Sequence, residues 1–252
     1  MDGEVAAVMS AGEEVVECLC GLNTSGEKPL AEIAAAFSKY VTAAYFDVRG
    51  RLQTVWLAFF DIVGETPPED QQRLVDFVLE LRKTTAENFS GHAIFHEIDG
   101  HLWHDLPGLT RAARDYWNFN EKTAFHNVSA FLARLTNFAV DPGDPRDPLN
   151  YSSFGLCALL ETFEETETHG DDDYAAIRSA SMWIQYSGDS LKELALREQD
   201  KMEARAGIPK ELRDKLWKGL VQEKWEVWKA GFEEVEDSVA EAKIAAQIMR
   251  EL

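Results

Sequence analysis

The sequence predicts an all-α fold, a single domain over residues 1–252 with about ten or eleven packed, mostly antiparallel helices. Apolar residues recur along most of the chain at the 3.6-residue spacing of an amphipathic helix. Runs of β-branched residues with alternating polarity, which are typical of strands, are absent from the sequence. The chain has 252 residues, 45% of them hydrophobic, which is enough to bury a substantial core.

Two helices are expected in the first third of the chain. Residues 29–48 place five apolar or aromatic side chains on one helical face: Ile33, Phe37, Tyr40, Val41 and Ala44. Residues 66–70 carry a helix-start signal, because prolines lie before or in the first turn and acids lie near the positive end of the dipole. The helix that follows has an apolar stripe of four residues: Leu74, Phe77, Val78 and Leu81.

Further helices are expected in the second half. The segment from Lys122 has an apolar stripe: Phe125, Val128, Phe131, Leu132 and Leu135. A continuous helix from about Pro209 has another: Trp217, Val221, Trp225, Trp228 and Phe232. Such a stripe is usually core and less often a partner surface. Residues 239–249 are amphipathic, and they either dock back on the body of the protein or pair with a second copy.

Two segments interrupt the helical pattern. Residues 141–148, rich in aspartate and proline, cannot continue a helix and predict an exposed loop. Residues 161–173 hold seven acids and no base, which predicts the end of one helix and the start of the next around His169 and Gly170. Calcium binding is not expected, because the tight alternation of oxygen ligands is missing. Neither segment is long enough for a domain linker, which favours one domain.

The charge balance excludes several classes of function. Forty-five acidic residues against twenty-five basic ones give a net charge of −20, so neither nucleic acid nor an anionic membrane surface is an expected partner.

No apolar stretch approaches the roughly 18 residues that span a bilayer, and the acidic amino-terminal residues do not form a secretory signal. The three cysteines are expected to be reduced thiols. The expected compartment is the cytoplasm, with the nucleus as the alternative.

Residues 92–117 hold four of the six histidines and two of the seven tryptophans. His92 and His96 would share a helical face, and with a nearby carboxylate two such ligands suit zinc or iron. The order of residues is not the His-Glu-x-x-His of zinc proteases, and Asp99-Gly100 is expected to break the helix after His96. A metal is therefore not predicted. Hydrogen-bonded histidines without a special role and the polar wall of a ligand pocket both stay open.

Cofactors and catalytic residues are not predicted. The sequence contains no Gly-rich phosphate loop, no Gly-x-Ser-x-Gly elbow and no dinucleotide fingerprint. Arg134 and Glu161 each lie in an apolar helical context, where a half-buried charge needs a partner. An Arg134–Glu161 pair is therefore a plausible structural clamp, with no catalysis implied.

Several short motifs follow one another between about residues 65 and 250: Trp103–Pro107, Arg114–Asn118, Asn127–Thr136, Leu159–Glu161, Met182–Gly188 and the pair Trp225 and Trp228. In this order they resemble a large fungal family, domain of unknown function three thousand six hundred and thirty-two. His126 departs from the family, which has a Trp-rich approach to its middle motif. His92, His96 and His101 also lie outside the family's motifs, so a metal site would be private to this chain.

The resemblance implies a fungal, intracellular, all-helical protein without an established activity. Members of the family often occur near secondary-metabolite genes, which raises the expectation of a small hydrophobic ligand. Two functions stay open. The first is a non-catalytic module that binds a partner protein or assembles with itself as a homodimer, as the absence of a catalytic constellation and the tryptophan stripe indicate. The second is a binding protein, or a cofactor-free cyclase or isomerase, for a small apolar metabolite.

The second function would use seven ligand-binding residues: His96, Trp103, His104, Asp105, Trp117, Arg134 and Trp183. The three tryptophans would shape a cavity, and His96 or His104 with Asp105 would supply hydrogen bonds or proton transfer. Asp105 also suits the N-cap of the following helix, which is a purely structural role.

Overall fold

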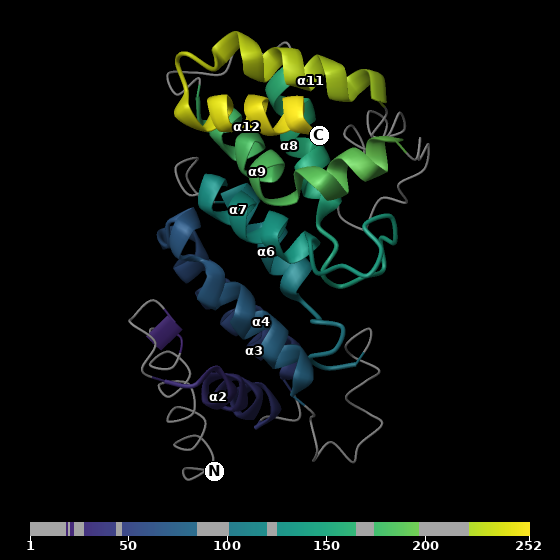
Figure 1. The fold of residues 1–252 in the computed structure, drawn as a ribbon. Helices are drawn as coiled ribbons and strands as arrows, with labels where there is room; N and C mark the ends of the chain where they lie inside the picture. Colours follow the sequence, from purple (N-terminus) through teal and green to yellow (C-terminus); the bar gives the residue numbers. More distant parts are fainter. Residues whose placement is uncertain are drawn as a thin grey trace. The chain divides into compact units, whose positions relative to one another are not determined.

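The computed structural model of the chain describes residues 19, 21–22, 28–43, 47–84, 101–119, 125–164, 174–196 and 222–252. Nine α-helices and one 3-10 helix lie in these ranges, which contain no strand (Figure 1). The all-α prediction is confirmed. The chain divides into two compact units, unit 1 over Met1–Phe119 and unit 2 over Asn120–Leu252. The prediction that both belong to one domain stays a prediction.

Five helical elements are defined in the described part of unit 1. They are α2 (Leu30–Thr42), α3 (Val48–Glu65), the 3-10 helix η1 (Pro68–Asp70), α4 (Gln72–Lys83) and α6 (Leu109–Phe119). Helix α2 packs against α3 and α4, and α3 packs against α6. The predicted helix start at residues 66–70 is confirmed, because η1 forms there and leads into α4. All four residues of the predicted α4 stripe are buried.

The core of unit 1 is built from aromatic rings. Helix α2 buries Phe37, as its spacing predicts, while Tyr40 is only half-buried and Ala44 lies outside the described residues. The ring centroid of Phe37 lies 5.0 Å from that of Trp56 on α3 and 5.5 Å from that of Phe77 on α4. Aromatic pairs at such distances add about 0.5–1.5 kcal/mol each beyond the area that they bury.

The residues of unit 2 that the structure describes form five helices. They are α7 (Phe125–Thr136), α8 (Ser152–Phe163), α9 (Ala175–Leu196), α11 (Gln222–Val235) and α12 (Ala240–Glu251). Helix α9 packs against all four others, and α11 also packs against α12 (Figure 1). Helix α9 is kinked at Ser187, whose backbone leaves the helical region. The four apolar residues of the predicted α7 stripe from Val128 onward are buried, and Phe125 is half-buried.

The carboxyl-terminal helices bury the predicted tryptophan stripe. Trp225, Trp228 and Phe232 have no exposed surface, whereas Trp217 and Val221 lie outside the described residues. Helix α12 packs against α9 and α11, so the amphipathic last stretch docks on its own unit. None of the described helices is both long enough and apolar enough to cross a membrane.

Candidate functional site

The first candidate region is the tryptophan loop, residues 101–108, which leads into α6. Trp103 and Leu106 have positive φ angles of 67° and 48°, and Gly108 has a φ of 84°. Residues with a side chain rarely adopt this conformation, which costs on the order of 1–3 kcal/mol at Trp103 and at Leu106, whereas glycine adopts it readily. Surrounding contacts must therefore hold the loop in its shape.

Trp103 supplies most of these contacts. Its side chain is fully buried, and its Nε1 donates a hydrogen bond of 2.8 Å to Ser38 Oγ on α2. Its ring lies 5.5 Å from Phe37 and 6.4 Å from Trp56, centroid to centroid. Trp56 Nε1 in turn donates to the Pro107 carbonyl oxygen at 2.9 Å. Trp103 anchors the loop in the aromatic core, and its predicted role toward a ligand stays a prediction.

The polar residues of the tryptophan loop form a cluster around one carboxylate. Asp105 Oδ1 lies 2.6 Å from His104 Nδ1, and Asp105 Oδ2 accepts the His101 backbone N–H at 2.6 Å. His101 Nδ1 lies 3.4 Å from the same Oδ2. The side chains of His101 and His104 are 82% and 69% exposed, so both imidazoles reach solvent. His104 and Asp105 therefore lie in contact, and their predicted role toward a ligand stays a prediction.

Asp105 does not cap α6. Its carboxylate turns back to His101, and the left-handed residues Leu106 and Gly108 separate it from the first turn, which begins at Leu109. The N-cap interpretation is therefore wrong. Partial burial acts to raise the pKa of Asp105, but the hydrogen bonds from the His101 backbone and the His104 side chain outweigh it. The pKa lies below its ordinary value of 3.8.

The remaining predicted site residues divide between the units. Trp117 is half-buried on α6 of unit 1. Arg134 on α7 and Trp183 on α9 belong to unit 2, and His96 lies outside the described residues. The structure thus brings together Trp103, His104 and Asp105 in one loop.

In unit 2, Trp183 and Arg134 each contact a neighbouring helix. A Cβ atom added to Gly155 on α8 would lie 2.8 Å from the Trp183 ring, so the glycine lets the indole lie against that helix. No acceptor for the buried Trp183 Nε1 occurs among the described protein atoms. The Arg134 guanidinium stacks 4.0 Å from the ring centroid of Tyr186. The predicted pairing of Arg134 with Glu161 stays a prediction.

A second candidate region, the triplet loop, joins α7 to α8. It is defined as residues 138–150 and contains the triplet Asp-Pro-x three times, at residues 141–143, 144–146 and 147–149. In each triplet the aspartate accepts the backbone N–H two residues ahead at 2.9 Å, from Gly143, Arg146 and Leu149 in turn. A backbone hydrogen bond also closes each turn over three residues. The loop is therefore three consecutive turns, as proline after aspartate favours.

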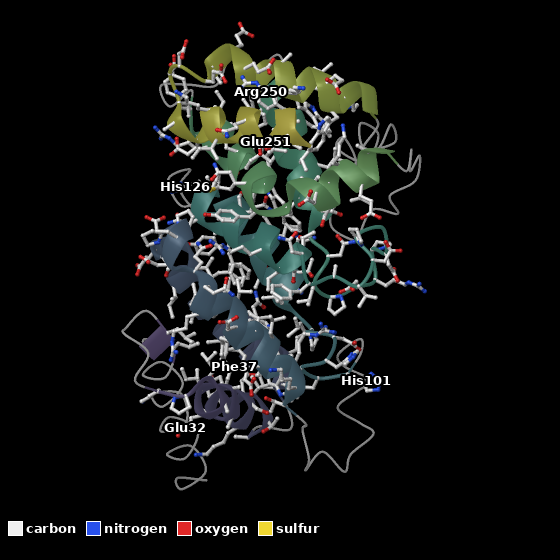
Figure 2. All side chains as sticks on the ribbon, viewed as in Figure 1. Glu32, Phe37, His101, His126, Arg250 and Glu251 are labelled. Atoms are coloured by element: carbon white, nitrogen blue, oxygen red, sulfur yellow. The ribbon has the colours of Figure 1, made fainter. Side chains whose placement is uncertain are left out.

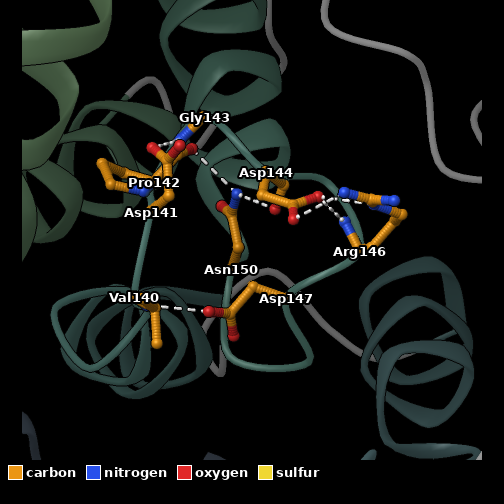
Figure 3. Close-up of polar contacts among 8 residues, drawn as sticks. All are labelled: Val140, Asp141, Pro142, Gly143, Asp144, Arg146, Asp147 and Asn150. Atoms are coloured by element: carbon orange, nitrogen blue, oxygen red, sulfur yellow. Dashed lines mark hydrogen bonds and ion pairs between the residues drawn. The ribbon is translucent and has the colours of Figure 1, made fainter.

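Three further hydrogen bonds, between residues farther apart in the sequence, close the triplet loop on itself. Asp147 Oδ2 accepts the Val140 backbone N–H at 2.7 Å, and Asn150 Nδ2 donates to the carbonyl oxygens of Pro142 and Asp144 (Figure 3). Val140 itself is 96% exposed, and Phe138 is 47% exposed. The loop prediction is confirmed, although most of residues 141–148 are half-buried rather than exposed. The sequence analysis missed the exposed apolar pair of Phe138 and Val140, although the repeated Asp-Pro-x triplet can be seen in the sequence.

In the acidic segment, residues 161–173, the one described acid after α8 has a structural role. Glu164, at the end of α8, accepts hydrogen bonds from Lys224 Nζ at 2.6 Å and from Trp228 Nε1 at 3.0 Å on α11. Residues 165–173 lie outside the described residues. Over the described ranges, no three or more His, Cys, Asp or Glu side chains are grouped so as to hold a metal ion.

Comparison with known proteins gives one finding. The family model described as "Protein of unknown function (DUF3632)" matches residues 56–232. The match includes the tryptophan loop and the triplet loop. No curated protein and no solved structure matches the chain.

Proposed function

The chain belongs to the family described as Protein of unknown function (DUF3632), and on that premise we propose that it is a non-catalytic helical module that binds a partner protein. One observation carries the proposal: the triplet loop holds Phe138 and Val140 toward solvent on a backbone tied by its own side chains. Loops fixed on a rigid scaffold are frequent binding elements.

The rigidity of the loop supports binding. A loop that is ordered before it meets a partner loses less conformational entropy on association than a flexible one. The Asp147 carboxylate accepts hydrogen bonds from the backbone N–H groups of both Val140 and Leu149, at 2.7 and 2.9 Å. A valine that is 96% exposed gives unit 2 no packing energy. Together with Phe138 it offers an apolar contact that a partner can bury.

Charge favours a different protein over a second copy of this chain. The chain carries a net charge of −20, and two copies repel each other. The triplet loop adds three aspartates and one arginine beside its apolar residues. The partner surface that suits it has an apolar pocket for Val140 and a rim of lysine or arginine.

Site-specific photo-crosslinking tests this function. A benzoylphenylalanine replaces Val140 in the full chain, and irradiation takes place in an extract of the source cells. The matched control carries the same probe at Val227 of α11, which is 54% exposed. We expect an adduct with a different protein from position 140 only. The purified captured protein should then bind Val140→Asp at least about tenfold more weakly than wild type, or about 1.4 kcal/mol.

Four outcomes contradict the proposal. The first is the absence of an adduct at position 140, and the second is the same adduct from position 227. The third is an adduct of twice the chain mass, which would mean self-assembly. Equal binding of the captured protein to wild type and Val140→Asp also contradicts it.

One observation favours the second candidate function, a small-molecule binding protein. The buried Trp183 Nε1 has no acceptor among the described protein atoms, and a buried donor left unsatisfied costs about 1–3 kcal/mol. A ligand carbonyl or hydroxyl in unit 2 would remove this cost. Replacing Trp183 by Phe deletes the donor and keeps an aromatic ring. If a metabolite raises the melting temperature of wild type and of Trp183→Phe equally, this role of Trp183 is excluded.

A further inference from the structure

Ser238 lies in the turn that joins α11 to α12, and its side chain is exposed. Among the serines and threonines that the structure describes, it alone combines an exposed position with a hydroxyl that makes no hydrogen bond. Thr54 is also exposed, but its Oγ1 donates to the Gly50 carbonyl oxygen at 3.0 Å. We propose that Ser238 is a phosphorylation site for a protein kinase that selects acidic sequences. The site is separate from the triplet loop, so its test is independent of the proposed partner binding.

The sequence around Ser238 suits a basic substrate cleft. Five acidic side chains and no basic one lie between residues 233 and 242: Glu233, Glu234, Glu236, Asp237 and Glu241. One of them directly precedes the serine, and another follows it by three residues. A kinase whose cleft is lined with lysine and arginine binds such a segment through complementary charge. The net charge of −20 favours its approach in the same way.

The turn presents the hydroxyl outside the two helices. Ser238 follows the end of α11, and its backbone N–H donates to the Val235 carbonyl oxygen at 3.0 Å. A kinase cleft therefore has to open only this turn, whereas a serine inside a helix is held by the surrounding ladder. Ser190 provides the contrast within the chain. It also precedes an acid, Glu193, by three residues, but it lies inside α9, and its Oγ donates to Asn137 Oδ1 at 3.5 Å.

The transfer needs only the hydroxyl from this chain. Ser238 Oγ attacks the γ-phosphorus of ATP bound to the kinase, and a new oxygen–phosphorus bond forms. The bond from the same phosphorus to the oxygen that bridges it to the β-phosphate breaks, and ADP leaves with the electron pair. The hydroxyl proton passes to the catalytic aspartate of the kinase. The product carries a charge of about −1.5 to −2 near neutral pH.

The phosphate lies beside the uncapped start of α12. The N-cap residue of this helix is Val239, and no side chain caps it by a hydrogen bond. A helix N-terminus favours anions, because its free N–H groups and its dipole point toward them. Two of the neighbouring acids are already paired, since Arg250, labelled in Figure 2, lies 2.9 Å from Glu233 and 2.5 Å from Glu236. Phosphorylation therefore caps α12 and strengthens its first turn.

Phosphorylation of the purified full chain tests the site. The chain is incubated with Mg²⁺-ATP and a purified serine/threonine kinase that requires an acid three residues after its target, and peptide mass spectrometry maps the phosphate. We expect phosphate at Ser238 and none at Ser190. Glu241→Gln should lower the initial rate of transfer to Ser238 at least about fivefold, because an acid that the kinase contacts is lost. Glu226→Gln removes the same charge from an exposed position of α11 and is the matched control, which should leave the rate unchanged.

Amide NMR of the phosphorylated chain tests the effect on α12. The backbone N–H groups of residues 240–242 should exchange more slowly with solvent than in the unphosphorylated chain, whereas those of α2 should be unchanged. Ser238→Ala treated with the same kinase should show no change at residues 240–242. A lack of phosphate at Ser238, or equal rates for wild type and Glu241→Gln, would overturn the site. Phosphate at Ser238 with unchanged exchange at residues 240–242 would overturn the capping of α12.

Discussion

The tryptophan loop and the triplet loop keep irregular backbones in place by opposite means. The tryptophan loop adopts three left-handed φ angles and is held from below by a buried indole that belongs to the core of unit 1. The triplet loop has no positive φ angle and is held by its own aspartate and asparagine side chains. The first loop therefore depends on the packing of its unit, whereas the second is largely self-contained. Mutations should separate these two kinds of support.

The largest effect is expected for Trp103→Ala. The change removes a fully buried indole, its contacts with Phe37 and Trp56 and the hydrogen bond to Ser38. Loss of a buried tryptophan costs about 3–5 kcal/mol of the free energy of unfolding. Urea denaturation and amide hydrogen exchange of α2, α3 and α4 measure it.

Val140→Ala is the matched control in the triplet loop. Val140 is 96% exposed, so its truncation should change the free energy of unfolding by less than about 0.5 kcal/mol. Similar losses from both changes would mean that the two loops are supported in the same way, and the comparison would fail.

The second effect separates the two glycines of the loops. Gly108 has a φ of 84°, and an added Cβ would lie 3.3 Å from Trp56 Cδ1, so Gly108→Ala should cost about 1–2 kcal/mol. Gly143 lies outside the left-handed region, and alanine keeps the backbone N–H that binds Asp141. Gly143→Ala should stay within about 0.5 kcal/mol. Thermal unfolding of the two variants measures both changes in stability. A larger loss of stability in Gly143→Ala than in Gly108→Ala would reverse the comparison between the two loops.

The third prediction concerns the polar support of the triplet loop. Asp147→Ala removes the acceptor for both the Val140 and the Leu149 backbone N–H groups. The expected cost is about 1 kcal/mol, because water replaces part of the lost hydrogen bonding in this partly exposed loop. Hydrogen exchange should accelerate at residues 140 and 149 and stay unchanged in α2. Asp147→Asn keeps one acceptor oxygen and should give a smaller effect, whereas unchanged exchange in Asp147→Ala would show that the carboxylate does not hold the loop.

The sequence predicts the conformation of the triplet loop better than that of the tryptophan loop. The helices around them follow from the apolar spacing, and the triplet loop follows from aspartate and proline, because the bonds that shape it are local. The left-handed conformation of Trp103 has no local signal, since an aromatic L-residue ordinarily avoids it. Its cause is Ser38 and the Phe37 ring, more than sixty residues away in the chain. Local chemistry is readable from a sequence, and long-range anchoring is not.

The same limit applies to the candidate site. His104 and Asp105 are neighbours in the chain, and their side chains lie in contact. The backward turn of the Asp105 carboxylate to His101 depends on the positive φ angles that follow it, so the N-cap interpretation was wrong. Whether Trp183 and Arg134 act on a ligand depends on packing between helices, which the spacing of apolar residues in the sequence does not reveal.

The smallest effect is a pH dependence in the tryptophan loop. The pKa of Asp105 in the folded chain lies below its ordinary value of 3.8, because the hydrogen bonds from His101 and His104 outweigh partial burial. The ionised carboxylate therefore stabilises the fold above that value, and this contribution is lost as the pH falls through the lower folded pKa. Asp105→Asn lacks the titrating group. The advantage of wild type should be about 0.2–1 kcal/mol near neutral pH, the range of exposed ion pairs.

Urea denaturation of wild type and Asp105→Asn from about pH 6 to about pH 2.5 measures this advantage, which should shrink toward the acid end. His104→Gln provides a second comparison, because it removes one hydrogen-bond partner of the carboxylate and should reduce the acid dependence without abolishing it. A difference between wild type and Asp105→Asn that stays constant or grows in acid would mean that the charge of Asp105 does not support the loop. The buried indole would then be its main support, and the contrast with the aspartate-built triplet loop would become sharper.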